Sequence, residues 1–201
     1  MKTRKQKKLR YVLLKTLEII IVIGLSIIIL FEMTLVVQKK FVYPVKYNEF
    51  ISEYSKVYQI EETLILSVIK VESNFNENAV SDKGAIGLMQ IKEETGEYIK
   101  TLLGDKKYDL KDAKTNIRYG MFYLKYLIDK FNDINTALCA YNAGEGKVKE
   151  WLKKQEYSDD GITLKSIPYE ETDNYISKIN RTIKKYKNLY PKIVDKSAKF
   201  E

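Results

Sequence analysis

The residue in this sequence best placed to do chemistry is Glu72, because it falls on the apolar side of a strongly predicted helix. Counting about 100° per residue along 62–74 places Glu72 inside an aliphatic arc of about 160°, with Lys70 on the opposite side. Desolvation penalises a carboxylate that faces a core, so its pKa rises and it can serve as a general acid near neutral pH. A carboxylate that is simply solvated where the helix ends fits the same pattern.

A second segment of interest, 81–91, combines two glycines with an apolar stretch that carries one amide. Gly84 and Gly87 allow close approach of the backbone, and Gln90 offers both hydrogen-bond donors and an acceptor. A plain helix entry with an exposed Gln90 explains the same residues.

A third segment, 140–144, ends a predicted helix at a glycine. The helix C-cap accounts for Gly144, but it does not account for a phenol and an amide side by side at Tyr141 and Asn142. The three segments together therefore hold the candidate site residues.

The composition excludes several classes of site. The chain has no histidine, which removes histidine-based triads and histidine zinc sites, and its one cysteine, Cys139, excludes an internal disulfide. Any general acid or base must be Glu, Asp, Tyr or Lys. We predict no metal site and expect Cys139 to be a small buried hydrophobe.

Most of the net charge of +8 comes from basic residues at the N-terminal end of the chain. Seven of the 35 basic residues lie in 1–15 with no acidic residue, so the rest of the chain carries 28 basic and 27 acidic groups. The basic run precedes the apolar segment 12–37, which is typical of a membrane segment rather than of a nucleic-acid-binding surface. We therefore predict no nucleic-acid partner.

The apolar segment is interpreted as an uncleaved anchor. Its uncharged part, 19–31, has the length of a signal peptide, but the extension to Val37 gives nineteen residues and includes only Glu32 as a charge. No small-residue cleavage site follows. The positive-inside rule places the basic end in the cytoplasm and everything after about residue 38 on the outer side of the membrane. The predicted localisation is thus the cell membrane, single-pass.

The remaining chain is predicted to be mostly α-helical. Strand signals are scarce, and helices are expected at 48–57, 62–74, 87–103, 112–131, 135–142, 145–154 and 171–189. Pro191 should stop the last helix. The predicted organisation is a basic tail, a membrane anchor, a connector, a catalytic domain and a C-terminal tail, at 1–11, 12–37, 38–47, 48–190 and 191–201.

Five blocks, taken in order, resemble the catalytic domain of lytic transglycosylases of the soluble-lytic-transglycosylase type, within the lysozyme-like group. The blocks are 72–76 (ESNFN), 84–91 (GAIGLMQI), Asn116 with Gly120 and Leu124, 140–144 (AYNAG), and 168–172 (PYEET) with Tyr175. Each block alone is weak evidence, but their joint order and spacing are specific. The resemblance covers about 48–185 and implies a lysozyme-like, goose-type helical domain.

The resemblance also implies roles for single residues. Glu72 matches the general acid/base. The implied substrate contacts are Ser73, Met89, Gln90, Tyr141 and Asn142. Glu171 matches a supporting carboxylate expected to hold Tyr141 by a hydrogen bond. No metal or organic cofactor is implied.

The reaction implied by the resemblance is cleavage of the β-1,4 bond between N-acetylmuramic acid and N-acetylglucosamine in peptidoglycan. Glu72 would protonate the leaving oxygen while the substrate's acetamido group supports C1, an exception to the usual pair of carboxylates. The same Glu72 would then take the proton of the muramyl C6 hydroxyl, which closes a 1,6-anhydro ring.

Two other functions stay open from the sequence. A hydrolytic muramidase would use Glu72 with water as the nucleophile, and its product would be one water heavier. A membrane-tethered wall-binding or assembly module of the same fold would keep its role without the Glu72 carboxyl. Wall or secretion-machinery proteins are further possible partners that the sequence does not identify.

Overall fold

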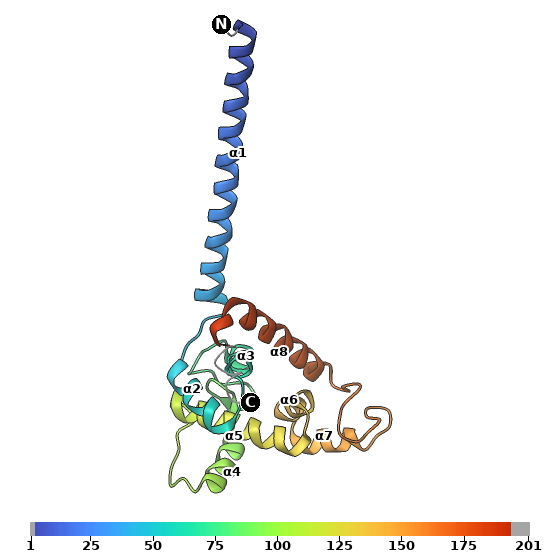
Figure 1. Ribbon diagram of the computed structural model, residues 1–201. Helices are drawn as coiled ribbons and strands as arrows, with labels where there is room; N and C mark the ends of the chain where they lie inside the picture. The colour runs from blue at the N-terminus through green and yellow to red at the C-terminus, as the bar shows by residue number, and fades with distance from the viewer. Residues whose placement is uncertain (1–2, 194–201) are drawn as a thin grey trace. The chain divides into compact units, whose positions relative to one another are not determined.

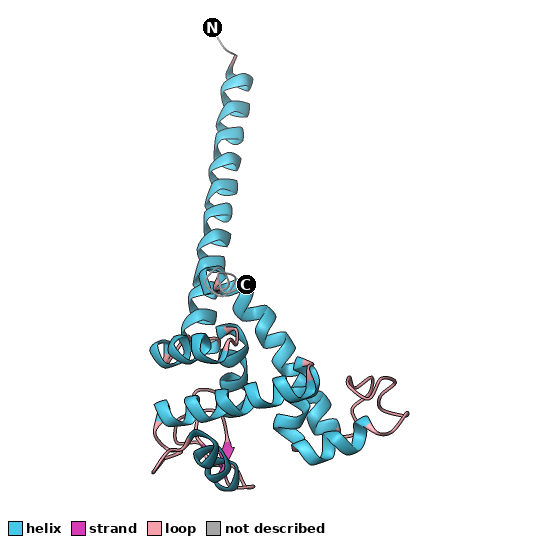
Figure 2. Cartoon of the chain, turned by 60° about the horizontal axis from the view of Figure 1, so that its bottom comes forward, coloured by secondary structure: helices cyan, strands magenta, loops and turns pink. Residues whose placement is uncertain are grey.

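The computed structural model describes residues 3–193, and almost all of its regular structure is helical (Figure 1; Figure 2). The chain divides into two compact units, up to Pro44 and from Val45 on. The elements are α1 (Arg4–Val37), the π-helix η1 (Gln38–Val42), α2 (Asn48–Tyr58), α3 (Glu62–Ser73), β1 (Ala85–Ile86), β2 (Ile91–Lys92), α4 (Glu93–Leu103), α5 (Ala113–Phe131), α6 (Ile134–Ala143), α7 (Glu145–Leu152) and α8 (Glu170–Leu189).

The first unit is one long helix, α1, continued by η1. Thr3 caps its start, because its hydroxyl accepts from the backbone of Gln6 while the Gln6 side chain accepts from the Thr3 backbone. The helix is long enough to cross a membrane, and its apolar window has a mean hydropathy of 2.8 with no residue buried. The predicted segment 12–37 lies inside this helix.

The second unit is built around α3. All residues of this helix from Glu62 to Ile69 are buried, so the helix is enclosed on every side over its first two turns. It packs chiefly against α8, while α5 packs against α2 and α6, and α6 also packs against α7 and α8. The last turn of α3, which carries Glu72, emerges from this core half-exposed.

Six of the seven predicted helices are confirmed to within two residues, as α2, α3, α5, α6, α7 and α8, and α8 ends before Pro191 as expected. The prediction of a helix over 87–103 was wrong at its start. Residues 85–92 form a short antiparallel hairpin, with Ile86 opposite Ile91, and α4 begins only at Glu93. Residues 194–201, most of the predicted C-terminal tail, lie outside the described residues.

The hairpin is held by one buried side chain, Asn116 of α5. Its amide oxygen accepts from the Met89 backbone N–H at 2.8 Å, and its amide nitrogen donates to the carbonyls of Ile86 at 2.9 Å and Leu110 at 2.8 Å. Gly87 leaves room for this amide, since a Cβ there would lie 2.7 Å from Asn116 Cγ. Asn116 thus fixes the 84–91 loop on α5.

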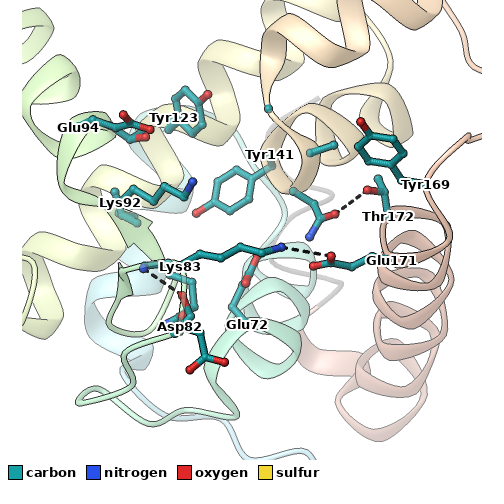
Figure 3. A pocket seen from close by; sticks show the side chains of 18 residues that line it. Glu72, Asp82, Lys83, Lys92, Glu94, Tyr123, Tyr141, Tyr169, Glu171 and Thr172 are labelled. Atoms are coloured by element: carbon teal, nitrogen blue, oxygen red, sulfur yellow. Dashed lines mark hydrogen bonds and ion pairs between the residues drawn. The ribbon is translucent and has the colours of Figure 1, made fainter.

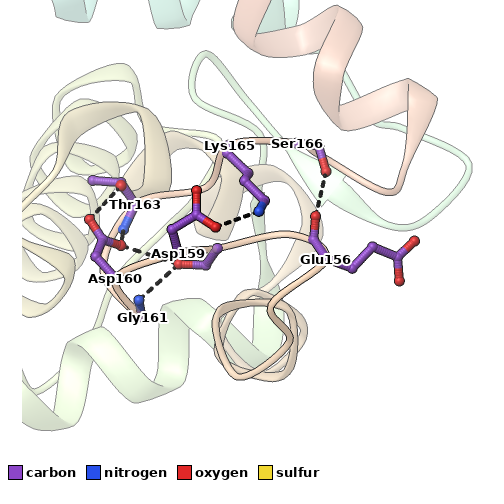
Figure 4. Close-up of polar contacts among 8 residues, drawn as sticks. Glu156, Asp159, Asp160, Gly161, Thr163, Lys165 and Ser166 are labelled. Carbon is purple, nitrogen blue, oxygen red and sulfur yellow. Dashed lines mark hydrogen bonds and ion pairs between the residues drawn. The ribbon is translucent and has the colours of Figure 1, made fainter.

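The connection between α7 and α8 is organised by Asp160 (Figure 4). Its carboxylate accepts from the backbone N–H groups of Thr163 at 2.7 Å and Ile162 at 2.8 Å, and these bonds hold its pKa below the usual range. Lys165 pairs with the neighbouring Asp159 at 2.5 Å. The loop is therefore folded on itself before it delivers Tyr169 to the start of α8.

We predict that Asn116→Ala destabilises the second unit by about 3 kcal/mol, because it leaves one buried N–H and two buried carbonyls without their partner. Chemical denaturation of the full chain measures the change. Asn180→Ala is the matched control, since Asn180 is exposed and makes one side-chain bond to Asn135. It should cost less than about 0.5 kcal/mol. Equal losses for both variants would contradict the role given to Asn116.

Candidate active site

A pocket of about 620 Å³ opens beside the end of α3 (Figure 3). Its walls come from the 81–85 loop, the hairpin, and helices α4, α5, α6 and α8. The lining residues are Glu72, Ser81, Asp82, Lys83, Ala85, Gln90, Ile91, Lys92, Glu94, Thr95, Tyr123, Tyr141, Asn142, Ala143, Gly144, Tyr169, Glu171 and Thr172. Of the six predicted catalytic and substrate-contacting residues, four line the pocket, namely Glu72, Gln90, Tyr141 and Asn142, whereas Ser73 and Met89 do not. The predicted supporting residue Glu171 also lines it.

Glu72 stands on the last turn of α3, just before the helix ends at Asn74 in the left-handed conformation. The Tyr175 hydroxyl donates to Glu72 Oε1 at 2.8 Å. Burial raises the pKa of Glu72 to about 7, although the hydrogen bond from Tyr175 favours the charged form and opposes the shift. The carboxyl group can therefore both give and accept a proton near neutral pH.

Two tyrosines, the half-buried Tyr141 and the buried Tyr175, flank this carboxyl group. Burial, and then the nearby Glu72, raise the pKa of both Tyr141 and Tyr175 well above the usual value, so both phenols stay protonated. Tyr141 donates its hydroxyl to the carbonyl of Met89 at 2.8 Å. This bond ties the end of α6 to the hairpin loop across the pocket.

Two amides in the lining can each offer one kind of hydrogen bond to a ligand. Gln90 donates from its amide nitrogen to the carbonyls of Ala79 at 3.2 Å and Gly87 at 2.9 Å, which uses both of its N–H groups. Its amide oxygen is thus the part that can receive a ligand N–H or hydroxyl. Asn142 accepts from the Thr172 hydroxyl at 2.8 Å, so its amide nitrogen supplies the donors.

The structure places Met89 and Ser73 outside the lining of the pocket. The Met89 side chain is fully buried against Gly120, where a Cβ would lie 2.7 Å from Met89 Cβ, so it cannot touch a sugar. Ser73 donates to the carbonyl of Leu88 at 2.9 Å and thereby joins α3 to the hairpin loop. Met89 thus shapes the pocket from behind its lining, and Ser73 does so through the loop that it holds.

The predicted hydrogen bond between Glu171 and Tyr141 was also wrong. A phenol has a single O–H, and that of Tyr141 is given to Met89. Glu171 instead pairs with Lys83 at 3.3 Å, with about 70% of each side chain exposed. Figure 3 shows this ion pair at the edge of the pocket, next to Thr172. The tyrosine that hydrogen-bonds to a carboxyl group in the site is Tyr175, and that carboxyl group belongs to Glu72.

Sequence reasoning gave no role to Tyr175 or Tyr123. Tyr175 lies on the inner stripe of α8, and its spacing from Thr172 and Ile179 marks a buried face without saying what that face meets. Tyr123 lines the pocket from α5, with its ring centroid 5.7 Å from that of Tyr141. Only the contact between distant helices identifies either residue.

Cys139 is buried as expected, and burial raises the pKa of its thiol to about 12. Within residues 3–193 no three cysteine or acidic side chains gather in the way a metal site requires.

Comparison with known proteins places these features in one family. Residues 49–163 match the family model of the transglycosylase SLT domain. The chain is 32% identical over 143 residues to the soluble lytic murein transglycosylase of Salmonella typhimurium, covering 68% of this chain and 22% of that protein. It is also 32% identical over 172 residues to the membrane-bound lytic murein transglycosylase C of Histophilus somni, covering 71% of this chain and 46% of that protein.

Solved structures agree with the sequence matches. The lytic transglycosylase Slt of Pseudomonas aeruginosa aligns over 73% of this chain and 24% of its own, with a TM-score of 0.65 at 27% identity. The 70 kDa soluble lytic transglycosylase of Escherichia coli aligns over 73% of this chain and 25% of its own, with a TM-score of 0.64 at 28% identity. The chain spans less than half the length of these relatives. The predicted helical, lysozyme-like fold is confirmed, and the chain belongs to the transglycosylase SLT domain family.

Proposed function

We propose that this protein is a membrane-anchored peptidoglycan lytic transglycosylase that cleaves the β-1,4 bond between N-acetylmuramic acid and N-acetylglucosamine, with Glu72 as its general acid and base. The observation that carries the proposal is a half-buried carboxyl group with a pKa of about 7 in a pocket large enough for saccharide units. Family membership supports the choice of substrate.

Glu72 serves first as the acid. Its protonated form donates to the glycosidic oxygen as the bond to C1 breaks, which avoids expelling an unstable alkoxide. The substrate's own acetamido oxygen supports C1 in place of a second carboxylate. The Asn142 amide nitrogen and the Gln90 amide oxygen supply a donor and an acceptor in the same lining and can orient that acetamido group.

Glu72 then serves as the base. The carboxylate left by proton donation takes the proton of the muramyl C6 hydroxyl, the C6 oxygen bonds to C1, and the acetamido group is released. The products are a 1,6-anhydromuramyl end and a free N-acetylglucosamine hydroxyl, and no water is consumed. A group that is half ionised near pH 7 performs both transfers at little energetic cost.

The long helix α1 anchors the enzyme. Its hydropathy and the basic residues at its N-terminal end support an N-terminus in the cytoplasm and a catalytic unit on the outer side of the membrane. The backbone from Tyr43 to Tyr47 leaves a connector of five residues, which spans at most about 17 Å.

Glu72→Gln should reduce cleavage of purified peptidoglycan by the full chain at least about 1000-fold, because the amide has no proton of suitable pKa to give. The products of the unaltered chain should carry the mass of anhydromuramic acid. Release of soluble fragments followed by mass spectrometry measures both. Products one water heavier would identify a hydrolytic muramidase, and undiminished cleavage by Glu72→Gln would remove Glu72 from the mechanism.

The pH dependence of kcat/KM should report the ionisation of Glu72. The acid form is present below its pKa, so kcat/KM should fall about tenfold per pH unit above about pH 7. Tyr175→Phe removes the hydroxyl that favours the carboxylate, so the pKa of Glu72 should rise and the fall in kcat/KM should move to higher pH. Tyr186→Phe, on the same helix and equally buried, is the control that should leave the profile in place. A profile that Tyr175→Phe does not move would contradict the effect of Tyr175 on the pKa of Glu72.

The same burial predicts how stability depends on pH. The pKa of Glu72 is about 4.5 in the unfolded chain and about 7 in the folded chain. Its contribution to the free energy of unfolding is therefore fully present below pH 4.5 and is lost as the pH rises to about 7. The shift corresponds to about 3 kcal/mol. Denaturation of both proteins should show Glu72→Gln gaining about that much relative to the unaltered chain between pH 4.5 and 7.5. A constant difference across this range would mean that Glu72 is solvated like a surface acid.

A further inference from the structure

Helix α8 has one face on which every charge is positive. From Asn174 to the helix end, the buried residues fall within an arc of about 140°, counted at about 100° per residue, and the opposite arc of about 120° is exposed along its whole length. No acidic residue occurs in 174–194. We call the exposed arc the basic face, and its residues are Asn174, Ser177, Lys178, Arg181, Lys184, Lys185 and Asn188.

The four cations of the basic face form no ion pair within residues 3–193. Arg181 donates to the carbonyl of Ser177 in its own helix at 3.2 Å. Lys187, which lies outside the basic face, is instead paired with Glu61 at 2.8 Å. The charges of the basic face are therefore available to a partner of opposite charge.

The helix dipole gives no reason for cations over this whole length. Cations are favoured near the C-terminal end of a helix, but the effect falls off within the last turn. The last turn of α8 contains Lys187 as its only basic residue. The basic face begins at Lys178, about three turns before the helix ends at Leu189.

We propose that the basic face of α8 binds the anionic phosphate headgroups of a lipid membrane. The proposal rests on the membrane anchor of the proposed function, because α1 and a connector of five residues keep a bilayer tethered to the same molecule at high effective concentration. Each Lys or Arg near an anionic surface strengthens binding about fivefold, so four of them on a tethered unit give a stable contact.

The side chains of the basic face favour a flat charged surface as the partner. The face is one side of a helix, about 21 Å long, and it contains no aromatic ring, whereas proteins that bind single-stranded nucleic acid combine cations with stacking aromatic side chains. It contains no apolar side chain either, so the contact lies at the headgroups and not in the hydrocarbon.

Contact with lipid fixes the distance between the bilayer and the catalytic pocket. Glu171 and Thr172 line the pocket at the start of α8, and the basic face occupies the rest of the same helix. One continuous helix of about 30 Å therefore connects the lipid contact with the pocket.

A fluorescent label next to the cations tests the proposal. Ser177→Cys places a thiol on the basic face, and the natural Cys139 is buried and does not compete for the label. The labelled full chain is reconstituted into vesicles of phosphatidylcholine, with or without an equal part of phosphatidylglycerol, that contain a lipid with a nitroxide quencher on its headgroup. Quenching should be at least about threefold stronger with phosphatidylglycerol, and this difference should vanish at about 1 M salt, where the Debye length is about 3 Å.

Matched controls separate the basic face from general effects of charge. Thr101→Cys labels an exposed residue of α4, which Figure 1 shows away from the end of α8, and its quenching should not respond to phosphatidylglycerol. Glutamine keeps the helix propensity and removes the charge, so the response should be lost in the variant Lys178→Gln, Arg181→Gln, Lys184→Gln, Lys185→Gln. The same loss of charge at four exposed lysines elsewhere should leave the response unchanged, in the variant Lys56→Gln, Lys106→Gln, Lys107→Gln, Lys111→Gln.

Equal quenching in both kinds of vesicle, or a response that survives the loss of the four cations, would overturn the proposal. A label on the basic face that responds to soluble poly(glycerol phosphate) but not to phosphatidylglycerol would also overturn it, and would assign the face to a wall polymer. Flotation with vesicles of phosphatidylcholine alone tests the anchor separately. A chain that floats only when phosphatidylglycerol is present would contradict the anchor and still support lipid binding by the basic face.

Discussion

The desolvation of a single carboxyl group, that of Glu72, is the constraint on which the site depends. Burial raises its pKa to about 7, and the hydrogen bond from Tyr175 limits the rise. The two effects oppose each other, so the group is left half ionised at neutral pH rather than locked in one form. Keeping it there costs the fold about 3 kcal/mol above pH 7. That is a substantial part of the 5 to 15 kcal/mol by which domains are usually stable.

The surrounding structure maintains that environment through hydrogen bonds between its own side chains and backbone groups. Asn116 fixes the hairpin, Ser73 joins α3 to it, and Tyr141 joins α6 to the Met89 carbonyl. These bonds connect elements that are far apart in sequence, so the walls of the pocket are held before substrate arrives. Such preorganisation is what lets a site orient a sugar without ordering its own loops at the moment of binding.

The features that depend on local periodicity were predicted correctly from the sequence. The helical arc placed Glu72 among aliphatic neighbours, and six helices were found within two residues of their observed ends. Prediction from the sequence failed where a contact between distant segments decides the outcome. The start of α4 was misplaced because Asn116 holds residues 85–92 in a hairpin, and the Tyr141 partner was misassigned because spacing along the chain does not show which oxygen a hydroxyl will reach. Tyr175 matched a motif, but only the packing of α8 on α3 shows that it touches Glu72.

The position of Glu72 on the last turn of α3 explains how one residue can be both buried and accessible. Two turns earlier, the helix is enclosed on all sides and no ligand could reach a carboxyl group there. One residue beyond Ser73 the chain turns at Asn74, which is exposed, and a carboxyl group there would keep an ordinary pKa. Only the boundary between these two regions combines desolvation with contact to a ligand. In this chain the end of α3 at the wall of the pocket provides both conditions for Glu72, and the left-handed residue at Asn74 sets where that boundary falls.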